Sequence, residues 1–113
     1  MERNAELDPI VQKSGLGKMA ALYLAGRDPW DPELCPLTVD LDGLPPMLIQ
    51  VGEDETLLDD SLRLHQRAED AGVLSQLDVW PHMIHVWPLF AGRLDEGDQA
   101  LEKAGAWLRR NWP

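Results

Sequence analysis

The chain has 113 residues, about the size of one domain, and a formal net charge of −10. Because an acidic surface repels phosphate groups, we expect no nucleic-acid partner. The polar N-terminus has no apolar stretch behind it, and no window approaches the roughly 18 apolar residues of a membrane span. A cytoplasmic location without a membrane span is therefore expected, and the single cysteine, Cys35, excludes an internal disulfide.

Residues 1–45 are predicted to form a lead-in of helices and loops. Asp8 followed by proline indicates a helix start, because Asp caps free N–H groups and proline suits the first turn. The glycines that follow are expected to interrupt this helix. A second helical piece over residues 18–25 is expected to end at a left-handed Gly26. Its apolar side chains favour core packing over the wall of a substrate site: Met19, Leu22 and Tyr23.

Prolines punctuate residues 28–46, which are predicted to form a loop, called the proline-rich loop below. Residues 46–113 are predicted to form a strand, a helix, a strand, a loop and a helix. The apolar runs and turn residues indicate strands at 47–51 and 76–80, with a helix at 59–71 between them. The last helix is amphipathic, and Asp95 and Asp98 are its candidate caps. This order indicates an α/β fold with a parallel strand pair and a right-handed crossover.

Two strands are too few for a stable parallel sheet, and the first strand is apolar on both faces. We therefore expect the chain to be part of a larger fold. A free apolar strand edge would invite association with another chain.

The loops after the two strands carry the residues best suited to chemistry. Parallel strands bring these loops to one edge of the sheet, so Asp54 and His85 can meet. An acid that orients a histidine base is what serine hydrolysis needs behind its nucleophile. From the pattern alone, Asp54 can equally be a solvated acid or a helix cap, and His85 a packed histidine. We expect His82 to be an exposed loop residue, His65 a surface residue, and no metal or cofactor to be bound.

Two segments resemble the bacterial hormone-sensitive-lipase-like esterases. Residues 43–60 contain a G-x-D-E-x-L-x-D-D pattern, and residues 77–87 end a strand in a short loop that closes on a histidine. The resemblance implies the C-terminal portion of an α/β-hydrolase fold, with its last two parallel strands and flanking helices. It also implies Asp54 as the acid and His85 as the base of a Ser-Asp-His triad. The parent activity would be acyl-enzyme hydrolysis of small carboxylic esters.

The nucleophile of that reaction has no counterpart in the sequence. Such enzymes carry it on a G-x-S-x-G elbow and use an H-G-G-G-type oxyanion loop, and the chain has neither motif. We therefore expect no esterase turnover from the chain alone. A second chain that supplies the nucleophile remains an alternative, as does a non-catalytic binding or oligomerisation module derived from the hydrolase fold. None of the serines fits the elbow: Ser14, Ser61 and Ser75.

Overall fold

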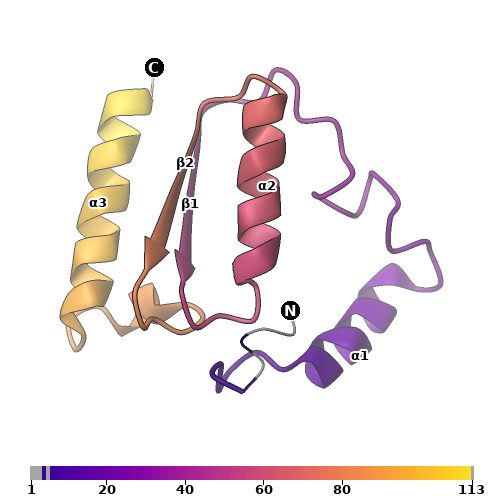
Figure 1. Ribbon diagram of the computed structural model, residues 1–113, viewed down its shortest axis with the longest axis horizontal. Coiled ribbons are helices and arrows are strands. Elements are labelled where there is room, and N and C mark those ends of the chain that lie inside the picture. Colours follow the sequence, from indigo (N-terminus) through magenta and orange to yellow (C-terminus); the bar gives the residue numbers. More distant parts are fainter. Residues whose placement is uncertain (1–3, 5, 113) are drawn as a thin grey trace.

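The structure is a computed structural model that describes residue 4 and residues 6–112. Figure 1 shows a strand pair between two helices, with a further helix set apart from them. In chain order the elements are α1 (Lys13–Leu24), β1 (Met47–Gly52), α2 (Leu58–Asp70), β2 (Ser75–Trp80), the 3₁₀ helix η1 (Trp87–Phe90) and α3 (Asp95–Asn111).

The two strands pair in parallel, as predicted, with Met47 opposite Ser75 and Gly52 opposite Trp80. Helix α2 contacts both strands, and α3 contacts β1. In Figure 1 these helices lie on opposite sides of the strand pair. The apolar residues of β1 therefore have a helix on either side, as a strand with two apolar faces requires.

A small core joins α2 to the loop that precedes β1. Its fully buried members are Leu41, Ala68 and Val73, and partly buried apolar side chains surround them. The guanidinium group of Arg67 donates hydrogen bonds to two carbonyl oxygens of the same loop, those of Leu37 and Val39. The proline-rich segment is therefore held against α2 although it has no regular structure of its own.

The expectation of a helix start at Asp8 was wrong. One carboxylate oxygen of Asp8 accepts hydrogen bonds from the backbone N–H groups of Ile10 and Val11, both at 2.9 Å, and so closes a turn. Its other oxygen accepts the N–H of Thr56, across the molecule. Because Asp8 is engaged in this long-range contact, α1 begins only after the turn. The glycines expected to interrupt the helix, Gly15 and Gly17, lie within α1 and do not interrupt it.

Helix α1 makes little use of its apolar side chains. It ends at Leu24 with a left-handed C-cap at Ala25 (φ 48°), one residue before the predicted Gly26, which is also left-handed (φ 86°). The expected core packing is not found, however, because no residue of α1 is buried against the described part of the chain. Three of its large apolar side chains are mostly exposed: Met19 by 65%, Leu22 by 83% and Tyr23 by 73%.

Helix α3 begins without the predicted side-chain caps. Leu94 occupies the N-cap position and makes no side-chain cap hydrogen bond. The carboxylate of Asp98 instead accepts the backbone N–H of Gly92 at 2.9 Å, which closes the loop before the helix. No helix of the described residues is long and apolar enough to cross a membrane.

Candidate active site

The loops that follow β1 and β2 meet at one rim of the sheet, as predicted. Both strands end at the lower edge of the view in Figure 1, where the N-terminal segment also lies. The N–H of Glu53 donates to the carbonyl oxygen of Trp80 at 2.8 Å, and the N–H of Asp54 donates to that of Met83 at 3.2 Å. Backbone hydrogen bonds therefore fix the position of one loop against the other.

Gly52 allows the two loops to approach this closely. A Cβ atom at this position would lie 2.1 Å from the carbonyl oxygen of Met83 and 2.6 Å from its carbonyl carbon. Both distances are far below van der Waals contact, and the obstructing atoms belong to backbone that is already hydrogen-bonded. Only glycine fits here without a displacement of one loop.

The histidine predicted as the base is paired with a carboxylate, and that carboxylate belongs to Glu55. The Nδ1 atom of His85 lies 2.9 Å from Oε2 of Glu55. The second oxygen, Oε1, accepts the N–H of Gly52 at 2.8 Å. The side chain of Glu55 is only 6% exposed and that of His85 is 29% exposed, so this charge-assisted contact is largely shielded from water.

Asp54 lies on the same rim, but its side chain faces another part of it. It lines a hollow together with Glu53 and His82, and it is not among the residues that line the cavity beside His85. No hydrogen bond between Asp54 and His85 is present among the described residues. The Asp54–His85 pair expected from the sequence is therefore replaced by a pair one residue further along the chain.

The turn geometry gives the physical reason for this shift. The N–H of Glu55 donates to the carbonyl oxygen of Gly52, so the chain reverses between these residues. The Glu55 side chain then folds back toward the end of β1, where it reaches both Gly52 and His85. The G-x-D-E pattern offers two adjacent acids, and the sequence alone does not show which of them points toward the histidine.

The ionised carboxylate of Asp8 accepts a hydrogen bond from this loop, at Thr56. The side chain of Asp8 is almost completely buried, with 1% exposure. Burial by itself would raise the pKa of the Asp8 carboxyl, but hydrogen bonds from the N–H groups of Thr56, Val11 and Ile10, together with the nearby His85, hold this pKa below its ordinary value. The sequence predicts only a helix cap at Asp8 and gives no sign of its contact with the rim.

The other two histidines differ from each other. His82 is 86% exposed, as predicted for a loop residue. His65 was expected on the surface, yet its Nδ1 lies 2.9 Å from the hydroxyl of Ser75 and its side chain is only 23% exposed. It therefore connects α2 to the start of β2.

One cluster of side chains has the composition of a metal site. Glu53, Asp54 and His82 each offer one ligand atom, and these atoms lie within 4.8 Å of one another. Their side chains are exposed or half-exposed, so they are accessible to water. Exposed acidic groups of this kind are common without an ion, and the cluster lies apart from the Glu55–His85 pair.

His85 opens onto a cavity of about 280 Å³ that Glu55, Gln50 and residues 86–89 also line. The indole ring of Trp87 is buried below this cavity, with 2% exposure, and contacts the ring of Trp80 at a centroid distance of 5.7 Å. Packing of these two rings fixes the loop that carries the histidine to the end of β2.

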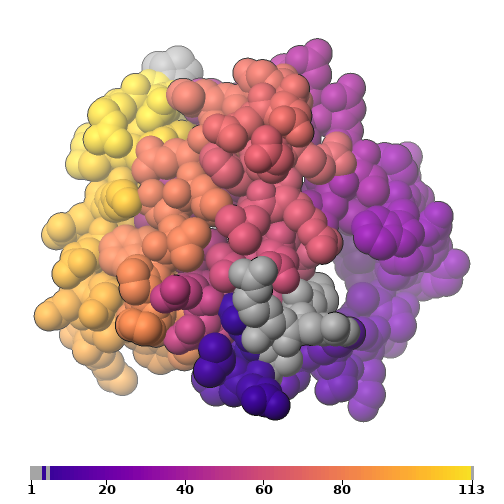
Figure 2. Space-filling view, viewed as in Figure 1, coloured from indigo at the N-terminus to yellow at the C-terminus, as the bar shows by residue number. Residues whose placement is uncertain are grey.

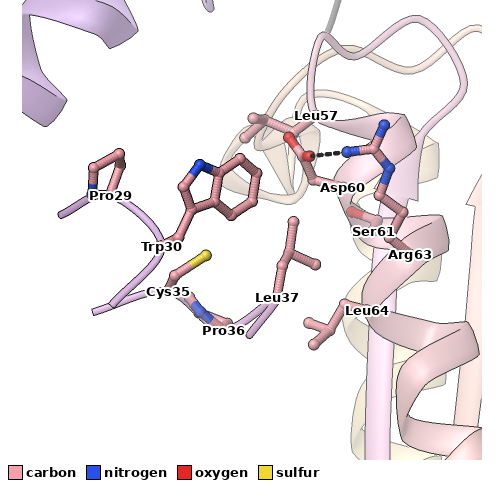
Figure 3. A pocket seen from close by; sticks show the side chains of 10 residues that line it. All are labelled: Pro29, Trp30, Cys35, Pro36, Leu37, Leu57, Asp60, Ser61, Arg63 and Leu64. Carbon is pink, nitrogen blue, oxygen red and sulfur yellow. Dashed lines mark ion pairs between the residues drawn. The ribbon is translucent and has the colours of Figure 1, made fainter. Parts of the chain in front are cut away.

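A larger hollow of about 480 Å³ lies away from this site. Figure 3 shows its walls: Trp30 and Leu37 from the proline-rich loop face Leu57 and Leu64 at and near α2. The thiol of Cys35 also lines it. Neither Glu55 nor His85 belongs to its lining, so this groove is separate from the Glu55–His85 pair.

Comparison with known proteins agrees with the fold. Residues 1–89 match the family described as having an alpha/beta hydrolase fold. An acetyl-hydrolase from Streptomyces hygroscopicus is 47% identical over 88% of this chain and 33% of its own length. An esterase from Acinetobacter venetianus is 45% identical over 87% of this chain and 33% of its own length.

Solved structures show the same relationship. An esterase from the bacterial hormone-sensitive lipase family is 49% identical and superimposes with a TM-score of 0.96, over 99% of this chain and 38% of the esterase. The esterase EstE5, soaked with p-nitrophenyl butyrate, is 48% identical with a TM-score of 0.92, over 96% of this chain and 36% of EstE5. The chain thus spans about a third of the length of these relatives. It belongs to the α/β-hydrolase family and corresponds to a C-terminal portion of the hormone-sensitive-lipase-family structure with which it superimposes.

Proposed function

We propose that this chain supplies the acid and the base of a serine-type carboxylic-ester hydrolase, with His85 as the base and Glu55 as the acid. The observation that carries the proposal is the 2.9 Å contact between Nδ1 of His85 and the buried carboxylate of Glu55 at the carboxyl ends of two parallel strands. The names of its relatives, acetyl-hydrolase and esterase, support small esters as the substrate class.

The contact defines the role of each nitrogen of the imidazole. Because an ionised carboxylate only accepts hydrogen bonds, Nδ1 of His85 carries the proton and Nε2 is left with its lone pair. Nε2 takes the proton of the nucleophilic hydroxyl as the new O–C bond forms at the ester carbonyl. It returns that proton to the leaving alkoxide when the ester bond breaks, and water repeats both steps to release the acid.

Glu55 stabilises the imidazolium that exists between these proton transfers. Its second oxygen is held by the N–H of Gly52, so the carboxylate is fixed before the charge develops. Asp54 has the residue type that the esterase resemblance implies for the acid, but it lines a different hollow. The two acids are adjacent in the chain, which makes them a matched pair for mutagenesis.

The nucleophile comes from outside these residues in this proposal, because the sequence contains no G-x-S-x-G elbow and no H-G-G-G-type loop. The 113-residue chain alone therefore does not turn over esters. An elbow segment, either covalently joined or added as a second chain, completes the site.

A segment exchange tests the proposal. The chain replaces the equivalent 38% of the hormone-sensitive-lipase-family esterase with which it superimposes. Hydrolysis of p-nitrophenyl acetate is then measured for the chimera, for its Glu55→Gln and Asp54→Asn variants, and for the isolated chain. We expect activity in the chimera, a loss of about 10³–10⁴-fold in kcat with Glu55→Gln, and a change of less than about tenfold with Asp54→Asn.

Three results would contradict the proposal. Turnover by the isolated chain that His85→Ala abolishes would place a nucleophile within it. A chimera that is inactivated by Asp54→Asn and tolerates Glu55→Gln would assign the acid to Asp54. A chimera that folds, as judged by circular dichroism, but hydrolyses no ester would favour a non-catalytic module.

A further inference from the structure

We propose that Asp8 is a positioning residue for the acid–base pair: it holds the loop of Glu55 in the one conformation that brings its carboxylate to His85. This inference rests on the proposed function of Glu55 and His85. It adds a residue from the N-terminal segment, 47 positions before Glu55, that touches neither substrate nor histidine.

The carboxylate of Asp8 connects two segments that are distant in the sequence. Oδ1 accepts the N–H groups of Ile10 and Val11, and Oδ2 accepts the N–H of Thr56 at 2.9 Å. Thr56 directly follows Glu55, so this bond fixes the peptide group on the C-terminal side of the acid. Figure 2 shows the indigo N-terminal segment against the magenta residues at the end of β1.

Further hydrogen bonds join the same two segments. The hydroxyl of Thr56 donates to the carbonyl oxygen of Val11 at 2.8 Å. The side-chain amide of Asn4 donates to the carbonyl oxygens of Glu53 and Glu55 at 2.6 and 3.0 Å. Backbone groups on both sides of the acid are therefore held, and Asn4, Asp8 and Thr56 are all buried.

The buried carboxylate of Asp8 depends on hydrogen bonds from both segments and not only on those within its own turn. An exposure of only 1% is costly for a charged group unless every oxygen is satisfied, and both oxygens of Asp8 are satisfied by backbone N–H groups. Loss of the charge would free the N–H of Thr56 and let the loop between Gly52 and Thr56 rotate. The Glu55 carboxylate would then leave the 2.9 Å contact that selects the Nδ1-protonated form of His85.

The test uses nuclear magnetic resonance on the full 113-residue chain. The population of the Nδ1–H form of His85 is read from its ring ¹⁵N shifts, and exchange of the Thr56 amide from deuterium uptake. Asp8→Asn is expected to reduce the ratio of the Nδ1–H to the Nε2–H form and to accelerate Thr56 exchange, each by about tenfold. Asp40→Asn is the matched control, because Asp40 also accepts a neighbouring N–H, at 3.0 Å, but in an exposed turn.

A second pair of variants keeps the test decisive if Asp8→Asn does not fold. Thr56→Val removes only the hydroxyl and should shift the His85 forms in the same direction, whereas Thr56→Ser should restore the wild-type spectrum. If folded Asp8→Asn or Thr56→Val chains keep the wild-type His85 population, the positioning role is wrong and the network is only structural. These readouts need no ester, so an inactive chimera with a responsive His85 refutes the proposed hydrolysis and leaves the positioning role intact.

Discussion

Two neighbouring segments of the chain, the turn at residues 8–12 and helix α1, have opposite relations to the rest of the molecule. The turn has no regular secondary structure, yet Asp8 and Val11 are buried and bonded to the loop that holds Glu55. Helix α1 follows immediately and is regular over 12 residues, but none of them is buried against the described residues. In this chain, therefore, a segment without regular secondary structure makes more contacts with the rest of the molecule than the regular helix that follows it.

The difference shows what fixes the rim. A helix satisfies its own backbone hydrogen bonds, so α1 needs no partner to remain helical in the structure. The rim loops cannot do this, because their N–H and C=O groups must find partners elsewhere, and they find them in each other and in the side chains of Asn4 and Asp8. Substitutions should consequently have large effects at the rim and small effects in α1.

The largest effect is expected from Gly52→Ala. The added Cβ would lie 2.1 Å from the carbonyl oxygen of Met83, so the two rim loops must separate. We expect the free energy of unfolding to fall by about 3 kcal/mol or more, measured by urea denaturation followed by circular dichroism. Gly105→Ala in α3 is the control: its Cβ would lie 3.6 Å from the nearest atom, and a helical alanine should stabilise by about 0.5–1 kcal/mol. Equal losses for both variants would contradict the close approach.

Acid should weaken the turn and leave α1 unaffected. The pKa of Asp8 is lowered in the folded chain relative to its ordinary value of 3.8. The ionised carboxylate therefore contributes stability that is fully present above about pH 4 and is lost as the pH falls through the lower, folded value. Asp8→Asn should lower the melting temperature at pH 7, and the difference from wild type should shrink below pH 4. A difference that stays constant down to pH 2 would show that the charge of Asp8 is not involved.

A smaller difference in the free energy of unfolding is expected between alanine substitutions of Val11 and of Leu22. Val11→Ala removes apolar groups from a buried site and should cost about 1.5 kcal/mol, since each buried methylene contributes about 0.8 kcal/mol. Leu22 is 83% exposed, so Leu22→Ala should change the free energy of unfolding by less than about 0.5 kcal/mol. The same urea titration measures both. A larger loss at Leu22 than at Val11 would show that α1 packs on another surface in solution.

The sequence predicted the strand–helix–strand unit and its parallel pairing because these depend on local patterns. The apolar run of β1 and the amphipathic pattern of α2 are readable in single segments. It also placed His85 on the correct rim. It did not predict Glu55 as the partner of His85, because the direction of a side chain in a tight turn depends on contacts with remote residues such as Asp8. For the same reason, it misplaced the beginning of α1.

The register of the strand pair has a consequence for how this rim tolerates change. Gly52 stands opposite Trp80, and Glu55 and His85 lie three and five residues beyond these partners. A slip of one position would move one loop by about 3.3 Å along the other and turn alternate side chains to the opposite face. The register of the two strands thus sets the spacing between the carboxylate and the imidazole. Single-residue insertions or deletions in either strand should disable the pair even where every rim residue is retained.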